Sequence, residues 1–196
     1  MKEHLAQGVQ RPLLLLSRPS RVSTEGLRGY LLRLSEANGL NGVAQLWPNR
    51  KPSVDDIESR LGVDRWPQNR TMLQDVIPQL ASTSGSPPLW NQRSSRYCPC
   101  CVNESAQWRW EWELTLVTCC HQHGVDLIED CHGCGKKLNW RRVSLMTCDC
   151  GVPLSKHIQT PSSIADKELS QIFYAKLHQL PVKQPHLTDL SLERFS

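Results

Sequence analysis

The residues best suited to chemistry in this sequence are its nine cysteines, which all lie between positions 98 and 150. Eight potential ligands fall in four closely spaced pairs: Cys98-Pro-Cys-Cys101, Cys120-His-Gln-His123, Cys131-His-Gly-Cys134 and Cys148-Asp-Cys150. A short spacer lets two side chains of one turn reach the same ion, and zinc prefers four such ligands in a tetrahedron. Four consecutive pairs therefore predict two zinc ions.

Pairing neighbours along the chain assigns the ligands to two sites. The first site takes Cys98, Cys101, Cys120 and His123, and the second takes Cys131, Cys134, Cys148 and Cys150. Gly135 and Gly151 directly follow ligands, as is typical of knuckle turns that bring backbone N–H groups near sulfur. Cys100 and Cys119 are left over, and we interpret them as small buried hydrophobic residues. On these residues alone, His121 competes with His123.

The predicted zinc is structural rather than catalytic. A catalytic site keeps one coordination position open for water, whereas protein ligands can fill all four positions in both sites here. The sequence has no HExxH motif, and no His-x-Glu precedes the cysteines as a deaminase would require. We therefore expect a protein that is not an enzyme, in which the metals contribute folding free energy.

Composition bounds the class of protein further. The 196 residues are 39% apolar and 21% charged, which suits one ordinary domain or two small ones. No apolar run approaches the roughly 20 residues of a membrane span or the about 7 apolar residues of a secretory signal. We therefore expect the protein to stay in the cytoplasm, a reducing compartment in which paired cysteines bind metal more often than they form disulfides. Seven thiolates and two zinc ions would lower the formal charge of +4 to about +1, so net charge does not argue for nucleic-acid binding.

Hydrophobic periodicity predicts several short helices. The first covers residues 23–38, with Ser23 as N-cap, Glu25 in the first turn and Gly39 after its end. Its apolar face is formed by Leu27, Tyr30, Leu31 and Leu34. Further helices are expected near 43–47, 53–62 and 71–80. Ser163 can cap a last helix whose apolar stripe is Leu169, Ile172, Phe173, Leu177 and Leu180.

The predicted fold is mainly α with small zinc-stabilised β hairpins. We expect an N-terminal helical domain with a helix-turn-helix-like arrangement over 1–81, a linker over 82–96, a tandem zinc-finger or zinc-ribbon region over 97–160, and a C-terminal helix and tail over 161–196. Trp108, Trp110 and Trp112 fit a strand or a helix equally well. We interpret them as core residues of the zinc region, although one exposed tryptophan would offer a stacking platform.

A basic cluster lies beside the second predicted zinc site. Lys136, Lys137, Arg141 and Arg142 surround Trp140. Cations beside an aromatic ring suit a phosphate backbone with a stacked base, as in RNA or single-stranded DNA. A solvated basic edge of a zinc ribbon explains the same residues. Arg18, Arg21 and Arg28 form a second basic group, and Arg33 is interpreted as an ion-pair residue.

Two blocks of the sequence resemble the TniQ family of transposition target-selection proteins. The first runs from Arg11-Pro12 through Glu25-Gly-Leu27 and Tyr30-Leu31-Leu-Arg33 to Asn38-Gly39. The second comprises Arg96-Tyr97-Cys98-Pro99, Cys101, the tryptophan-rich segment, Cys120-x-x-His123-Gly124 and Cys131-x-x-Cys134-Gly135. The resemblance places Cys98, Cys101, Cys120 and His123 on the family's first zinc motif and leaves Cys100 and Cys119 outside it. The Cys148-Asp-Cys150 pair is tighter than a CxxC and departs from the pattern.

The resemblance implies a function that spacing alone does not. Members of this family are adaptors in heteromeric bacterial DNA transposons and connect a target-site signal to the AAA+ ATPase TnsC, which recruits the transposase. The short chain looks like the compact form found in CRISPR-associated transposons. The expected partners are TnsC, a guide RNA–effector complex and target DNA, with no membrane and no small-molecule substrate, in the bacterial cytoplasm. The alternative is a zinc-finger DNA-binding factor that reads the target site directly.

Overall fold

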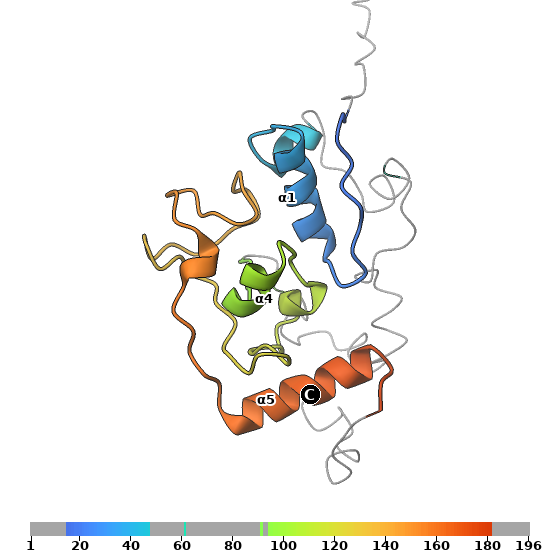
Figure 1. Cartoon of the computed structure of the whole chain (residues 1–196), viewed down its shortest axis with the longest axis vertical. Helices are drawn as coiled ribbons and strands as arrows, with labels where there is room; N and C mark the ends of the chain where they lie inside the picture. Colours follow the sequence, from blue (N-terminus) through green and yellow to red (C-terminus); the bar gives the residue numbers. More distant parts are fainter. Residues whose placement is uncertain (1–14, 48–60, 62–90, 92–93, 182–196) are drawn as a thin grey trace, which may run out of the picture.

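The computed structural model describes residues 15–47, 61, 91 and 94–181, and its regular structure is mainly helical (Figure 1). The elements are α1 (Leu27–Ala37), α4 (Pro99–Glu104), α5 (Ile164–Leu177) and three 3₁₀ helices, η1 (Val43–Leu46), η3 (Trp110–Glu113) and η4 (Leu154–Lys156). In this part of the chain the predicted β hairpins are reduced to isolated antiparallel bridges. None of the helices described is long and apolar enough to cross a bilayer.

Helix α1 begins later than its sequence predicts. Its N-cap is Gly26, so the prediction of Ser23 as N-cap is wrong. The preceding backbone is held extended against the tryptophan-rich segment, since Gly26 N–H donates to the Trp108 carbonyl (2.8 Å) and Trp110 N–H donates to the Thr24 carbonyl (3.2 Å). This pairing keeps the preceding residues out of the helix.

Glu25 consequently lies before the first turn of α1 rather than in it. Its fully buried carboxylate accepts hydrogen bonds from Arg33 Nε (2.9 Å) and Nη2 (2.6 Å). A bidentate arginine satisfies a buried carboxylate well. The interpretation of Arg33 as an ion-pair residue is confirmed. The pair joins the N-terminal segment to the helix that follows it.

Two faces of α1 enter two different hydrophobic clusters. The predicted apolar face, Leu27, Tyr30, Leu31 and Leu34, is buried with Leu46, Trp47 and Leu61. Leu32, on another face, is fully buried in the larger cluster that contains five of the candidate metal ligands. The helix ends at Ala37 with Asn38 as C-cap, and Gly39 adopts φ +66°, as predicted for a glycine that terminates a helix.

Helix α1 packs directly on the cysteine-rich half of the chain. A Cβ atom on Gly29 would lie 2.5 Å from the Trp108 Cβ, so only glycine allows this approach. At the other end of the helix, Glu36 accepts hydrogen bonds from Ser144 Oγ (2.9 Å) and the Leu145 N–H (3.1 Å). The N-terminal helix and the cysteine-rich region therefore share one core.

The three alternating tryptophans are all buried. Trp108 precedes η3, which contains Trp110 and Trp112, and each side chain is at most 2% exposed. Trp108 contacts Trp112 edge-on, with ring centroids 6.0 Å apart. The interpretation of these residues as core is confirmed, and the alternative of an exposed stacking platform is wrong for all three.

Helix α5 lies across the lower end of the molecule in Figure 1, beneath α4. Ser163 caps it as predicted, because its hydroxyl accepts the Asp166 N–H (3.1 Å). Of the predicted stripe, Ile172, Phe173 and Leu177 are buried, Leu169 is half-buried and Leu180 is exposed. Cys119 Sγ donates to Ser170 Oγ (3.3 Å), which joins the helix to the cysteine-rich region.

Several predictions fall outside the described residues. The helix expected near 71–80 does so entirely, as does the helix near 53–62 apart from Leu61, which is helical and buried. The helix-turn-helix-like arrangement depends on these helices and stays a prediction. Within the expected linker, Ser94 and Ser95 are buried. The domain boundaries at 81, 96 and 160 also remain predictions.

Candidate metal centres

The structure gathers the first four predicted ligands around one point. The sulfur atoms of Cys98, Cys101 and Cys120 and a ring nitrogen of His123 all lie within 4.8 Å of one another. The His123 Nδ1 atom is 3.5 Å from Cys98 Sγ, 3.2 Å from Cys101 Sγ and 3.5 Å from Cys120 Sγ. Cys101 Sγ is 3.7 Å from Cys120 Sγ. We refer to this group as cluster 1.

The remaining four predicted ligands form cluster 2, namely Cys131, Cys134, Cys148 and Cys150, whose sulfur atoms also lie within 4.8 Å of one another. Cys131 Sγ is 3.6 Å from Cys150 Sγ, and Cys134 Sγ is 3.8 Å from Cys148 Sγ. Cys131 and Cys148 are buried, whereas Cys134 and Cys150 are exposed. Cluster 2 therefore sits at the surface with two of its four thiols inside the core.

The distances fit the edges of a zinc tetrahedron. Zn–S bonds of about 2.3 Å and Zn–N bonds of about 2.0 Å imply S···S edges of roughly 3.8 Å and S···N edges of roughly 3.5 Å. The S···S distances of 3.6 to 3.8 Å and the S···N distances of 3.2 to 3.5 Å lie close to these values. Each cluster can hold one metal ion, and both donor sets are compatible with structural zinc.

Cluster 1 combines a helix N-terminus with a knuckle turn. Cys98 is the N-cap of α4 and Cys101 lies in its first turn, after Pro99 has set the helical φ. Cys120 and His123 come from a turn in which Gly124 N–H donates to the Cys120 carbonyl (2.8 Å) and Cys120 N–H donates to the Val125 carbonyl (2.8 Å). His123 N–H also points at Cys120 Sγ (3.5 Å).

Cluster 2 is built from two further turns, each closed by the N–H of a glycine that follows the second ligand. Gly135 N–H donates to the Cys131 carbonyl and Gly151 N–H to the Cys148 carbonyl, both at 2.8 Å. The glycines have φ of +67° and +87°, which confirms that these positions favour glycine. Gly124 in cluster 1 has φ +62° and occupies the same place after its ligand pair. The Cys148 turn is one residue shorter than the other two, and its two sulfur atoms still lie within 4.8 Å of the other cluster 2 ligands.

Glu104 is a neighbour of cluster 1 that the sequence analysis did not single out. The His123 Nε2 atom lies 2.8 Å from Glu104 Oε1. A carboxylate on the second ring nitrogen fixes the tautomer and orientation of a metal-binding histidine and leaves Nδ1 free to ligate. Glu104 ends α4, the helix that carries Cys101. No ligand-spacing pattern includes it, because it acts through the histidine.

The thiols within each cluster differ in the direction in which their pKa values are shifted. Hydrogen bonds from Cys101 and Cys98 lower the pKa of Cys120, and the hydrogen bond with Cys101 raises the pKa of Cys98. Burial raises the pKa of Cys148 to about 12. Burial would also raise the pKa of Cys131, but the N–H groups of Cys134 and Gly133 lower it to about 7. In each cluster the pKa of one thiol is thus lowered while that of a neighbouring thiol is raised.

The other cysteines and histidine considered as ligands lie outside the two clusters. The His121 ring stacks on Tyr174 of α5, with centroids 3.6 Å apart, so His123 rather than His121 joins cluster 1. Cys119 is fully buried and bonded to Ser170, and Cys100 is half-buried against the core. Both therefore behave as the predicted small core residues.

The predicted nucleic-acid residues divide into two groups. Lys136, Lys137 and Arg141 are exposed, and Trp140 is half-buried against the core. Lys137 forms an ion pair with Glu129. Arg142 is only 1% exposed, and its guanidinium is used inside the protein, so its prediction as a nucleic-acid contact is wrong. The exposed cations of this surface are Lys136, Lys137 and Arg141.

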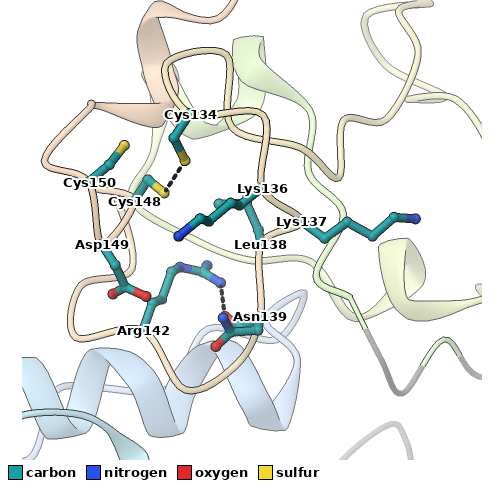
Figure 2. A pocket seen from close by; sticks show the side chains of 9 residues that line it. All are labelled: Cys134, Lys136, Lys137, Leu138, Asn139, Arg142, Cys148, Asp149 and Cys150. Atoms are coloured by element: carbon teal, nitrogen blue, oxygen red, sulfur yellow. Dashed lines mark hydrogen bonds between the residues drawn. The ribbon is translucent and has the colours of Figure 1, made fainter.

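A pocket of about 330 Å³ adjoins cluster 2 (Figure 2). Its wall includes Cys134, Cys148 and Cys150 of the cluster, together with Asp149. Figure 2 shows Lys136 reaching across it and Lys137 pointing away, with Arg142 beneath. The pocket therefore places positive side chains beside a group of thiols.

Four-ligand clusters of this kind are compatible with structural metal sites. A family model described as TniQ matches residues 16–127, which is more than half of the chain. The chain belongs to the TniQ family, a non-catalytic, transposition-associated family. The match contains cluster 1 and ends before cluster 2. A search of curated proteins returned no match.

Proposed function

We propose that this protein is a non-enzymatic adaptor in the selection of transposition targets, which links a guide RNA–effector complex to the AAA+ ATPase TnsC. The match to the TniQ family over residues 16–127 is the observation that carries the proposal. The matched span includes α1, α4 and all of cluster 1. In this role the protein holds partners together and recruits the transposase through TnsC.

The two clusters support a scaffolding role. Four protein ligands around each ion leave no position for a substrate or an attacking water molecule. The ligands also come from segments far apart in the sequence, as Cys98 and His123 do in cluster 1. Metal binding then contributes free energy to holding these segments in one arrangement, which gives an adaptor a defined surface.

Co-elution on a size-exclusion column tests the proposal. The purified protein is mixed with TnsC, ATP and DNA, and in a second sample with the guide RNA–effector complex. We expect the chain to elute with each partner and to bridge them when both are present. Retention of one DNA sequence over others without either partner would instead support the direct DNA reader. Elution alone in every mixture would contradict the adaptor.

The surface formed by Lys136, Trp140 and Arg141 is the proposed nucleic-acid contact. Replacing Lys136 and Arg141 with alanine should weaken binding to single-stranded RNA or DNA. For a single strand, removing one cation that binds a phosphate should lower the slope of log affinity against log salt by about 0.7. Fluorescence anisotropy over a salt series measures both the affinity and the slope.

Lys156 provides the matched control. It is exposed in η4, away from Trp140 along the chain, and Lys156→Ala removes one positive charge, as each of the two substitutions does when made alone. The affinity and salt slope of this variant should stay at the wild-type values. If the Lys136 and Arg141 variant binds as the control does at low salt, this surface does not contact nucleic acid.

A further inference from the structure

Arg142 is a buried cation without a carboxylate partner among the described residues. Its side chain is 1% exposed, and no described carboxylate oxygen lies within 4.0 Å of it. The guanidinium donates only to neutral oxygens: Ser95 Oγ (2.8 Å) and the carbonyls of Asn139 (2.7 Å), Ser144 (3.0 Å) and Leu145 (3.3 Å). These bonds satisfy its donors, and its charge is offset only at longer range, first by Asp149 in the same pocket, although burying a charge is unfavourable.

Two tryptophan faces offset part of that cost. The guanidinium carbon lies 4.5 Å from the centroid of the Trp108 ring and 5.6 Å from that of Trp140. The negative face of an aromatic ring attracts a cation, most strongly where water is excluded. A ring carries no net charge, however, so the two tryptophans do not neutralise the guanidinium.

Asp149 and a metal-loaded cluster 2 would together supply negative charge beside Arg142. Four thiolates around a divalent ion carry a net charge of −2. Arg142 and three of the four cluster thiols line the same pocket, and Figure 2 shows Arg142 directly below the loop of Cys148 and Asp149. Cys131 and Cys148 also belong to the same hydrophobic cluster as Trp108. Although burial lowers the pKa of Arg142 to about 10, Asp149 and Cys148 act to keep it protonated.

We propose that Arg142 is the internal counter-ion of the metal-loaded cluster 2 and the positioning residue that couples this metal to Trp108 and Trp140. When the ion leaves, the loop of Cys148 and Asp149 that lines the pocket beside Arg142 is no longer held by coordination, and Arg142 loses the charge of the loaded cluster. The stack on the tryptophans then loses stability. Coupling of this kind is reciprocal, so removing the Arg142 charge must lower the affinity of cluster 2 for its metal ion.

Two substitutions in the full chain separate charge from shape. Arg142→Gln removes the charge and keeps hydrogen-bonding groups, whereas Arg142→Lys keeps the charge and loses the planar fork. Cobalt(II) replaces zinc as the probe, because its absorption distinguishes a four-thiolate site from a site with three thiolates and one imidazole. Competition with a chelator then gives the affinity of each cluster separately.

We expect Arg142→Gln to lower the cobalt affinity of the four-thiolate cluster at least about tenfold, which is the lower bound for removing a group that supports metal ligands. The affinity of cluster 1 should change less. Arg142→Lys should recover most of that affinity. Leu145→Ala is the control, since Leu145 is buried in the same loop but carries no charge. It should lower the thermal midpoint without weakening one cluster selectively.

A measurement on the wild-type protein covers the case in which Arg142→Gln does not fold. As a chelator empties the four-thiolate cluster, the near-ultraviolet circular dichroism of the tryptophans should change in step with the cobalt absorption. The proposal is overturned if the tryptophan signal does not follow that cluster, or if the wild-type chain binds fewer than two ions. It is also overturned if Arg142→Gln keeps full affinity, or if the lysine and Leu145 variants lose the same cluster to the same extent.

Discussion

At the scale of single residues, the two clusters assign different roles to chemically similar neighbours. Cys100 and Cys101 are adjacent on α4, yet only Cys101 brings its sulfur near the other ligands, 3.7 Å from Cys120 Sγ. The helix turns successive side chains by about 100°, so two adjacent cysteines cannot both face the same ion. The ligand role therefore follows from the phase of the helix.

Replacing Cys101 with serine should remove one of the two metal ions and unfold the region around cluster 1. A structural zinc site contributes about 10–16 kcal/mol in zinc-finger peptides, which is comparable to the whole stability of a small domain. Elemental analysis and thermal unfolding measure the two effects. Cys100→Ser is the matched control and should retain both ions, so equal behaviour of the two variants would show that cluster 1 has been wrongly assigned.

At the scale of elements, the docking of α1 depends on the absence of one side chain. Gly29 faces Trp108 at a distance that leaves no room for a Cβ, and Trp108 is fully buried against Tyr97, with ring centroids 5.2 Å apart. Neither ring can move without disturbing the core around both clusters. The position of α1 is thus set by the same aromatic residues that pack against the candidate metal ligands.

Gly29→Ala should destabilise the protein by about 1–3 kcal/mol, as overpacking of a well-packed core does, despite the higher helix propensity of alanine. Chemical denaturation of the metal-loaded protein measures the change. Ala37→Ser, at an exposed position of the same helix, should stay within about 0.5 kcal/mol of the wild type. A stabilising effect of Gly29→Ala would mean that α1 does not approach Trp108 so closely.

At the scale of the whole molecule, five of the eight candidate metal ligands belong to the main hydrophobic core. One hydrophobic cluster joins Leu32 of α1, the aromatic residues Tyr97 and Trp108, and the ligands Cys98 and Cys131. The described part of the chain has few regular elements besides the helices, and single bridges replace strands. We therefore expect metal coordination at the two clusters to supply part of the order that backbone pairing supplies in other folds.

Chelation of both ions should accordingly unfold α1 as well as the cysteine-rich region. Far-ultraviolet circular dichroism should lose helical signal and tryptophan emission should shift to the red, because Trp108 and Trp112 become solvated. Addition of zinc under reducing conditions should restore both signals. Retention of the native signals in a chain shown by elemental analysis to be free of metal would refute a structural role for the ions.

The pairing of the ligands was predictable because it depends on local geometry. A turn of four residues with a glycine after the second ligand brings two side chains together wherever it occurs, as Cys131, Cys134 and Gly135 show. The Ser163 cap and the end of α1 at Gly39 are local for the same reason. Each depends on residues within a few positions of one another.

The sequence by itself determined the four ligand pairs, the cap of α5, the end of α1 and the membership in a family of transposition-associated proteins. Only the tertiary structure decided that Arg142 lies inside, that all three tryptophans are core and that α1 begins at Leu27. These outcomes depend on contacts between segments distant in the chain, such as Ser95 with Arg142 and Thr24 with Trp110. Local residue patterns do not predict such contacts, because the burial of a side chain depends on which distant segments pack against it.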